Sequence, residues 1–411
     1  MSTLFRLFLI LLPIIDNEAF KNQACFHSGN THSLSPEKSH SALNRKRLTQ
    51  HSTTKNDSID PYLDENLGYQ VKQTLDEFKG MGFYVHIPYC RRRCRYCDFA
   101  IVPVGNDSLL KEKESFLEMD AKYKAAILQE MELLVESLDT KISLKSIYFG
   151  GGTPSLAPIS TIRAIMDSIL TSGKFQLDDT AEITMEMDPG TFDLKHAEEL
   201  KQMGFNRISL GVQSFDNRIL EVIGRVHRLQ DIKDAVDIIK RVFGGEANYS
   251  MDLISGLPGL TCAKWAETLE MAVSMSPPPA HLSLYDMQIE KNTVFGEWYK
   301  EQLIDDDEDQ NGNVDVKNVK VGVENTWNLP SIQNTNNNIL PLPTPDDCAF
   351  MYKYASGYLK AKGFEHYEIS SYARIMDNSI KSNKEAKNKR SIHNQIYWDI
   401  EGDWCGEFVV V

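Results

Sequence analysis

The chain has 411 residues, of which 42% are hydrophobic and 25% charged, an ordinary composition for a globular protein. Its net charge of −14 excludes a protein that coats nucleic acid through charge alone. A mean hydropathy of −0.35 excludes a polytopic membrane protein, and we expect no stable membrane span. Seven cysteines in this length exclude a disulfide scaffold. Residues 1–60 carry +2, so residues 61–411 carry −16, which predicts a leader on an acidic body.

Residues 1–60 are typical of a targeting leader. The apolar run 7–15 follows Arg6 and is too short to span a bilayer, but it suits a signal peptide. Residues 20–57 are rich in Ser, Thr, Asn and Lys and have the composition of a transit peptide. Together they resemble the bipartite leaders of algae with secondary plastids, which implies entry into a plastid. The alternatives are a mitochondrial presequence and a disordered N-terminus.

In residues 61–303, β-rich runs alternate with segments of helical periodicity. The predicted strands are Phe83–Ile87, Ser146–Phe149, Glu182–Met187, Arg207–Leu210, Tyr249–Ile254 and His281–Tyr285. The predicted helices are Glu114–Leu138, Ile159–Leu170, Leu194–Met203, Leu229–Val242 and Lys264–Ser274. Such alternation predicts an α/β fold of parallel units, shorter than the ~250 residues of a closed eight-unit barrel. We therefore expect an open (β/α)6 partial TIM barrel, with functional groups at the carboxyl ends of its strands.

The stretch 304–345 interrupts the pattern. It opens on five consecutive acids, Asp305–Asp309, and continues through Asn-rich sequence that cannot bury a core. It predicts a disordered acidic insertion. The stretch 346–411 contains a helical segment, Ala349–Lys362, and then a second polar loop, Lys381–Arg390.

Three cysteines with C-x3-C-x2-C spacing, Cys90, Cys94 and Cys97, directly follow the first predicted strand. Structural zinc usually takes four ligands, and disulfides would leave one of the three thiols unpaired. A [4Fe–4S] cluster normally takes four thiolates, so three would leave one iron open to an external ligand.

The triplet resembles the signature of the radical S-adenosylmethionine (radical SAM) superfamily. This resemblance implies that the open iron is chelated by the amino and carboxylate groups of S-adenosylmethionine. It also implies that an electron from the reduced cluster cleaves the cofactor to a 5′-deoxyadenosyl radical. Four arginines, at 91–93 and 95, place positive charge beside the thiols. They either favour the reduced cluster and attract an anionic electron donor, or belong to a solvent-facing loop.

Five further motifs follow in chain order. A glycine triplet, Gly150–Pro154, succeeds the second strand and lets the backbone approach a ligand closely. Glu186 and Asp252 end strands with carboxylates that accept hydrogen bonds, and Gln213 ends one with an amide. Arg225, twelve residues after Gln213, offers a guanidinium that can clamp a carboxylate. Each motif alone is only weak evidence for a cofactor site. The glycines could form an ordinary β/α turn, Glu186 could form an internal salt bridge, and Arg225 could be a surface residue.

Together these motifs resemble one branch of the superfamily, the oxygen-independent coproporphyrinogen III dehydrogenases and their HemW-type haem-chaperone relatives. The resemblance covers Phe83 to about Gly406, interrupted at 304–338. It makes Cys90, Cys94 and Cys97 the cluster ligands. It assigns the S-adenosylmethionine contacts to Tyr84, Tyr96, Gly151, Gly152, Thr153, Glu186, Gln213, Arg225 and Asp252.

The dehydrogenases and the haem chaperones share the cofactor motifs, so the choice between them depends on the positions at which their sequence patterns differ. The dehydrogenase pattern has a Cys where this chain has Phe99, and no clear N-terminal arm precedes Gly82. The segment 393–398, HNQIYW, matches a His-Asn-x-x-Tyr-Trp motif proposed as a haem site in the chaperones. His393 is accordingly a candidate ligand of haem iron, with Tyr397 and Trp398 beside the macrocycle. The alternative is a histidine and aromatic residues that simply pack in a core or domain joint.

The resemblance thus implies a haem chaperone that binds a [4Fe–4S] cluster, S-adenosylmethionine and haem, and delivers haem to a client protein. It also implies a small electron-donor protein of flavodoxin or ferredoxin type. The alternative is an enzyme that decarboxylates coproporphyrinogen III to protoporphyrinogen IX. In the family, the haem motif leads into a further C-terminal domain. Here the chain ends at Val411, so we expect a C-terminally truncated member.

Overall fold

The structure is a computed structural model that describes residues 81–107, 110–300, 339–375, 389–398 and 408–410. The chain divides into two units, one of residues 78–135 and 140–411, the other of residues 1–77 and 136–139. Of the second unit only residues 136–139 are described, and the sheet and the candidate site belong to the first. The predicted leader, residues 1–60, and positions 304–338 of the predicted insertion lie outside the described residues.

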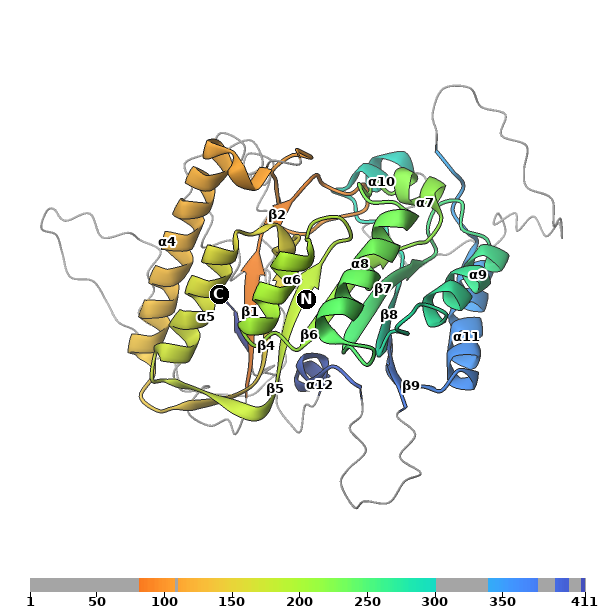
Figure 1. Cartoon of the computed structure of the whole chain (residues 1–411). Coiled ribbons are helices and arrows are strands. Elements are labelled where there is room, and N and C mark those ends of the chain that lie inside the picture. Colours follow the sequence, from red (N-terminus) through yellow and green to blue (C-terminus); the bar gives the residue numbers. More distant parts are fainter. Residues whose placement is uncertain (1–80, 108–109, 301–338, 376–388, 399–407, 411) are drawn as a thin grey trace, which may run out of the picture. The chain divides into compact units, whose positions relative to one another are not determined.

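A nine-stranded sheet forms the centre of this unit (Figure 1). Its parallel core consists of the six predicted strands, β1 (Met81–Ile87), β4 (Ile142–Gly151), β5 (Phe175–Met187), β6 (Arg207–Gln213), β7 (Tyr249–Ser255) and β8 (His281–Asp286). At one edge β11 (Phe408–Val410) pairs in parallel with β1. At the other edge β10 (Ser371–Arg374) and β9 (Phe364–Glu368) continue antiparallel from β8. The predicted open (β/α)6 partial barrel is confirmed.

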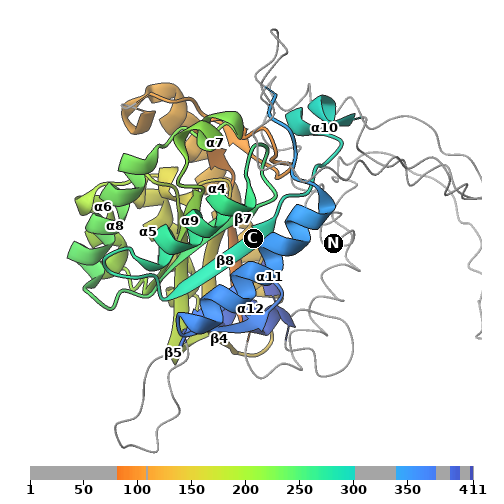
Figure 2. The same cartoon turned by 90° about the vertical axis from the view of Figure 1, so that its right-hand side faces the viewer.

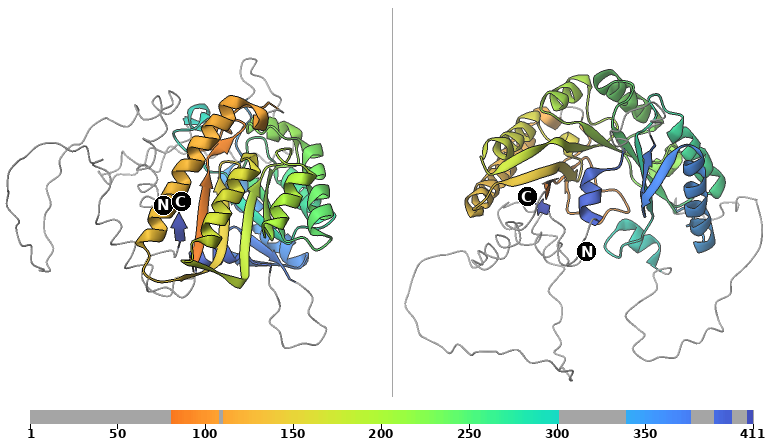
Figure 3. Two further views of the ribbon diagram at one scale, coloured as in Figure 1. Left: turned by 60° about the vertical axis from the view of Figure 1, so that its left-hand side comes forward. Right: turned by 90° about the horizontal axis from the view of Figure 1, so that it is seen from below.

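Helices cover the convex side of the curved sheet, as Figures 2 and 3 show. Those expected from periodicity are α4 (Glu114–Ser137), α5 (Ile159–Thr171), α6 (Leu194–Gln202), α8 (Leu229–Phe243), α9 (Cys262–Val273) and α11 (Pro345–Ala361). Shorter helices that we did not predict are α7 (Asn217–Val222), α10 (Val294–Trp298) and α12 (Ile392–Trp398). Unlike the covering helices, α12 lies on the concave side of the sheet (Figure 3, right). Among the described residues, no helix is both long and apolar enough to cross a membrane.

The two faces of the sheet differ in polarity. On β4, Ile147 and Phe149 are fully buried, while Ser146 and Tyr148 alternate with them and take the opposite face. Parallel strands are usually apolar on both faces, because helices cover both. Here the concave face carries charged and hydroxyl side chains even where it is buried, as at Glu182. This polar concave face is where the candidate site lies.

Residues 339–345, which composition assigned to the insertion, are part of the ordered fold. Tyr299 donates its hydroxyl to the carbonyl of Leu340 at 2.6 Å, and Pro341 accepts from the amide of Gly259 at 2.8 Å. Thr344 caps α11, which begins at Pro345, earlier than the predicted Ala349. A short proline-containing peptide has no hydrophobic period, so its packing on the turn after β7 gave no signal in the sequence.

Candidate cofactor site

The three cysteines occupy one loop at the carboxyl end of the sheet. Cys90 closes the two-residue strand β2 (Tyr89–Cys90), which pairs with β3 (Val102–Pro103), and the loop between them carries Cys94 and Cys97. All three thiols are half-buried and interact electrostatically with one another. In the described part of the chain, no three His, Cys, Asp or Glu side chains are placed to hold a single metal ion.

The arrangement of the thiols fits a cluster. A [4Fe–4S] cluster takes each thiolate on a different iron, so its ligands surround a volume and need not converge on one point. Burial raises the pKa of Cys90 to about 12, so this thiol would lose its proton only when a cation such as iron binds. A set of three sulfur donors in a partly dry loop therefore suits iron better than a solvated hard cation.

The arginines around the thiols are hydrogen-bonded to main-chain carbonyls. Arg92 donates to the carbonyls of Gly224 and Arg225, both at 2.6 Å, and Arg95 donates to that of Val222 at 2.6 Å. Arg91 and Arg93 similarly donate to the carbonyls of Gly190 and Phe99. The bonds of Arg92 and Arg95 fasten the cysteine loop to the segment that follows β6, that of Arg91 fastens it to the turn after β5, and that of Arg93 lies within the loop. The arginines therefore have a structural role in addition to the positive charge that the sequence indicated.

Each glycine of the triplet at the carboxyl end of β4 is required for a different contact. A Cβ atom at Gly152 would lie 2.6 Å from the carbonyl oxygen of Tyr89. At Gly151, where φ is +113°, it would lie 2.6 Å from the ring of His86. At Gly150 it would lie 2.8 Å from the rings of Tyr84 and Tyr148. The triplet thus allows β4 to pass close to the backbone before Cys90 and to the rings on the concave face.

Glu186, at the end of β5, is a half-buried residue whose carboxyl group has neutral hydrogen-bond donors. The hydroxyl of Tyr148 donates to its Oε1 at 2.7 Å, and the amide of Gly151 to its Oε2 at 3.1 Å. Burial raises the pKa of Glu186 to about 8 despite these hydrogen bonds. A nearby cation would stabilise the carboxylate, so the position suits the amino group of an amino-acid cofactor.

Thr153 and Arg225 meet at Asp188, a residue that the sequence analysis missed. The Thr153 hydroxyl donates to Asp188 at 3.2 Å and lies 3.6 Å from the sulfur of Cys90. Arg225 forms an ion pair with Asp188 and lies 3.7 Å from the sulfur of Cys94. The spacing could have indicated this residue. Asp188 follows Glu186 by two residues, and residues two apart along an extended chain point to the same face.

The remaining predicted contacts are Gln213 at the end of β6, Asp252 in the middle of β7 and not at its end as predicted, and Tyr96 in the cysteine loop. Gln213 has φ of +64° and follows a bulge in β6, which directs a side chain out of the regular alternation. Asp252 accepts from the hydroxyl of Ser209 at 2.9 Å, and burial raises its pKa to about 6. Asp252 also interacts electrostatically with Glu186, and the buried phenol of Tyr96 does so with Arg225. The structure thus places most of the predicted contacts at the carboxyl end of the sheet, while Tyr84 and Asp252 lie in the middle of β1 and β7.

His393 lies on α12, on the concave face below this edge. Its imidazole stacks on Tyr148, with 4.6 Å between ring centroids, and its Nδ1 lies 2.9 Å from the hydroxyl of Ser146. Burial lowers the pKa of His393 to about 3, so the ring is neutral at physiological pH. The side chains of Tyr397 and Trp398 lie outside the described residues.

Comparison with known proteins agrees with this geometry. The model of the Radical SAM superfamily matches residues 84–272. The chain is 34% identical over 315 residues to a protein of Synechocystis sp. named heme chaperone HemW, covering 77% of this chain and 61% of that protein. It is 31% identical over 326 residues to the HemW of Buchnera aphidicola, covering 79% of this chain and 68% of that protein. The chain belongs to the HemW-type branch of the radical SAM superfamily.

Among solved structures, the coproporphyrinogen III oxidase HemN of Escherichia coli is similar in fold. The TM-score is 0.55 at 22% identity, with 76% of this chain and 59% of that chain covered. Membership of the radical SAM superfamily implies a [4Fe–4S] cluster and S-adenosylmethionine, which fits the three thiols and the carboxyl group of Glu186. This radical SAM chain spans about three fifths of its Synechocystis relative and two thirds of its Buchnera relative.

Proposed function

We propose that this radical SAM protein is a haem chaperone that binds haem through His393 and delivers it to a haem-dependent client protein. One structural relationship supports this proposal most. The haem motif lies on α12 with His393 stacked on Tyr148, whose hydroxyl donates to Glu186 in the cofactor site. The two predicted ligand sites are therefore joined by direct contacts. The relatives named heme chaperone HemW support the same function.

In the proposed cofactor site, Cys90, Cys94 and Cys97 would hold the cluster, and a bound cluster would supply electrons for reductive cleavage of S-adenosylmethionine. Glu186 would pair with the cofactor's amino group, and the backbone of the glycine triplet, whose Gly151 amide donates to Glu186, would allow the cofactor a close approach. Asp252 and Gln213 offer an acceptor and an amide to the ribose. The proposed contacts are Tyr84, Tyr96, Gly151, Gly152, Thr153, Glu186, Gln213, Arg225 and Asp252.

Phe99 bears on the choice between chaperone and dehydrogenase. It stands where the dehydrogenase pattern has a further cysteine, and its side chain is 64% exposed beside the cysteine loop.

The arginines nearby add positive charge to the same surface. We propose that a small acidic electron donor, of flavodoxin or ferredoxin type, docks there, because opposite charges steer association.

Parallel assays of haem binding and porphyrinogen turnover test the proposal. The full chain is reconstituted anaerobically with iron and sulfide, supplied with S-adenosylmethionine and a reductant, and titrated with haem while the Soret band is followed. We expect saturable haem binding that His393→Ala weakens and His366→Ala, a control on β9, leaves unchanged. Decarboxylation of coproporphyrinogen III at enzymatic rates, or wild-type haem binding indistinguishable from that of His393→Ala, would overturn the proposal.

We further propose that residues 1–60 direct the chain to an organelle, a plastid ahead of a mitochondrion. The support is the apolar run followed by a Ser- and Thr-rich stretch. A fluorescent reporter fused to residues 1–60 should enter an organelle, and markers for the two compartments decide between them. A reporter that stayed in the cytosol would reject both.

A further inference from the structure

Three aromatic rings meet on the concave face and connect α12 to the sheet. This ring cluster consists of Tyr84, Tyr148 and His393. Tyr148 stacks on His393 with 4.6 Å between centroids and 23° between planes, and on Tyr84 with 6.0 Å and 13°. The centroids of Tyr84 and His393 are 6.3 Å apart. The three rings therefore form a triangle in which Tyr148 contacts a residue of β1 and a residue of α12, although His393 is 245 positions further along the chain.

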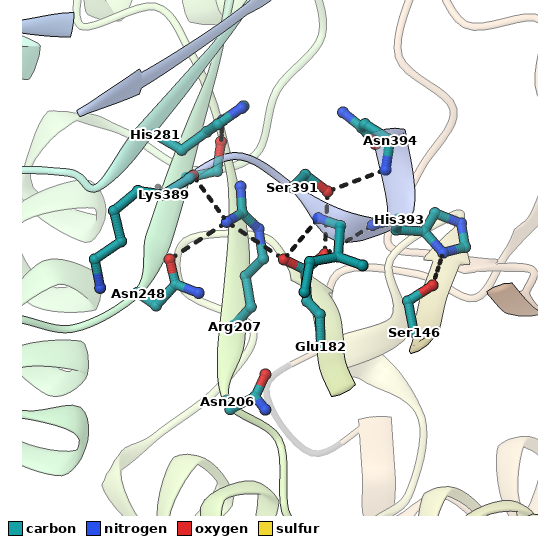
Figure 4. A network of polar contacts seen from close by, with 12 residues as sticks. Ser146, Glu182, Asn206, Arg207, Asn248, His281, Lys389, Ser391, His393 and Asn394 are labelled. Carbon is teal, nitrogen blue, oxygen red and sulfur yellow. Dashed lines mark hydrogen bonds and ion pairs between the residues drawn. The ribbon is translucent and has the colours of Figure 1, made fainter. Parts of the chain in front are cut away.

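A buried carboxylate holds α12 at this place (Figure 4). Glu182 accepts from the hydroxyl of Ser391 at 3.1 Å and from the amides of Ile392 and His393 at 3.1 and 3.2 Å. These amides are at the N-terminus of α12, where helical N–H groups need an external acceptor. Because β5 supplies that acceptor, the sheet itself determines where His393 lies.

The hydroxyl of Tyr148 then fixes a carboxyl of the cofactor site. It donates to Glu186 at 2.7 Å, and the second oxygen of Glu186 accepts from Gly151 at 3.1 Å. Packing of the Tyr148 ring sets the direction of its O–H bond, and with it the position of Glu186. The ring has little room to shift, because a single Cβ atom added at Gly150 would already lie 2.8 Å from it.

We infer that His393 is a positioning residue of the S-adenosylmethionine site, acting through Tyr148 on Glu186. This inference rests on the proposed cofactor site and adds a second role to the predicted haem ligand. A haem that binds His393 changes the contacts of Tyr148, so haem and S-adenosylmethionine alter each other's affinity by the same factor. The haem motif would thereby sense whether the cofactor is bound.

Dissociation constants of S-adenosylmethionine, measured by equilibrium dialysis on the anaerobically reconstituted full chain, test the inference. His393→Ala removes the stacked ring and should weaken cofactor binding by about three- to tenfold, the worth of one aromatic pair. His393→Phe keeps a ring at that place and should retain the affinity, while losing the nitrogen that ligates haem iron. The stacked pair His366–Tyr372, with centroids 4.2 Å apart on β9 and β10, provides the control, and His366→Ala should change nothing.

A double-mutant cycle separates this role from general damage to the fold. If His393 acts through the hydroxyl of Tyr148, then His393→Ala should cost less than about twofold in a Tyr148→Phe background. Equal costs in both backgrounds, or equal losses for His393→Phe and His393→Ala, would overturn the inference. A wild-type chain that binds S-adenosylmethionine but no haem would reject the chaperone function and the coupling to haem, and leave the positioning role of His393 standing. A wild-type chain that binds no S-adenosylmethionine would overturn it.

Discussion

Glu182 on β5 and Arg207 on β6 form an ion pair on the concave face, with 3.6 Å between Oε2 and Nη1. Their side chains are only 4% and 3% exposed. Arg207 also donates to the side-chain oxygen of Asn248 at 3.3 Å and to the carbonyl of Lys389 at 3.4 Å (Figure 4). This buried pair therefore anchors both the N-terminus of α12 and the residues that lead into it.

Removing the carboxylate of that pair should destabilise the fold. Glu182→Ala leaves Arg207 buried without its counter-charge and α12 without its acceptor, so we expect a loss of about 3–5 kcal/mol in the free energy of unfolding. Glu365→Ala is the matched control. It breaks the ion pair between Glu365 and Arg390, and both of these side chains are about one third exposed. That change should cost less than about 1 kcal/mol. Urea unfolding measures both, and equal losses would refute the anchoring role.

Two glycine-to-alanine changes, one in the glycine triplet and one in helix α11, should have opposite effects on stability. Gly152→Ala places a methyl group against the carbonyls of Tyr89 and Pro88, so we expect a loss of about 1–3 kcal/mol and less cluster incorporated. Gly357→Ala, in α11, meets no atom within 4 Å and should stabilise the chain by up to about 1 kcal/mol. Thermal unfolding and iron content are the readouts. A Gly152→Ala chain as stable as wild type, with full iron content, would argue against close packing there.

The raised pKa of Glu186 predicts how stability without cofactor depends on pH. Burial raises its pKa to about 8 in the folded chain, whereas an unfolded glutamate titrates near about 4.3. Between these values the folded state holds a proton that the unfolded state has released. The free energy of unfolding should therefore fall as pH rises from about 4.3 to about 8 and then level off. In Glu186→Gln this decline should be smaller. Superimposable pH profiles of the two proteins would contradict the assignment.

Arg92 is expected to support the cofactor site without contacting the cofactor. Its guanidinium holds the carbonyls of Gly224 and Arg225 beside the cysteine loop. Arg92→Gln should therefore weaken S-adenosylmethionine binding less than Arg225→Gln does, with the iron content unchanged. Equilibrium dialysis and iron analysis of the two variants measure this order. A larger loss for Arg92→Gln would mean that its charge matters more than its hydrogen bonds.

The sequence predicted the parallel core of the fold because its strands are short apolar runs between helices of clear periodicity. It did not predict β9, where FEHYE mixes charged and aromatic residues, or α12, which is only seven residues long. α12 is held by Glu182, which is distant in the sequence, and the β9–β10 hairpin is joined to the sheet through the distant strand β8. Local sequence carries no record of such partners, so propensity alone could not find them.

In the candidate site, too, the residues that follow local sequence rules were predicted and those that depend on distant contacts were not. Cysteine spacing and strand-end polar residues indicated the cofactor residues, because they follow local rules. Asp188 and Tyr148 were missed because their roles depend on which neighbours the register of the sheet places opposite them. The arginines were read as a charged patch, and their hydrogen bonds to the turn after α7 depend on contacts more than 120 positions away.

The central claim is that one loop of three thiols holds a cluster to which S-adenosylmethionine binds. The most direct test is the electron paramagnetic resonance spectrum of the reconstituted, reduced chain, recorded with and without S-adenosylmethionine. We predict a [4Fe–4S]⁺ signal that changes shape when S-adenosylmethionine is added. The signal should be absent from Cys90→Ala, Cys94→Ala and Cys97→Ala, and it should persist in Cys262→Ala and Cys348→Ala. A wild-type signal indifferent to S-adenosylmethionine, or one that survives loss of all three thiols, would contradict the account.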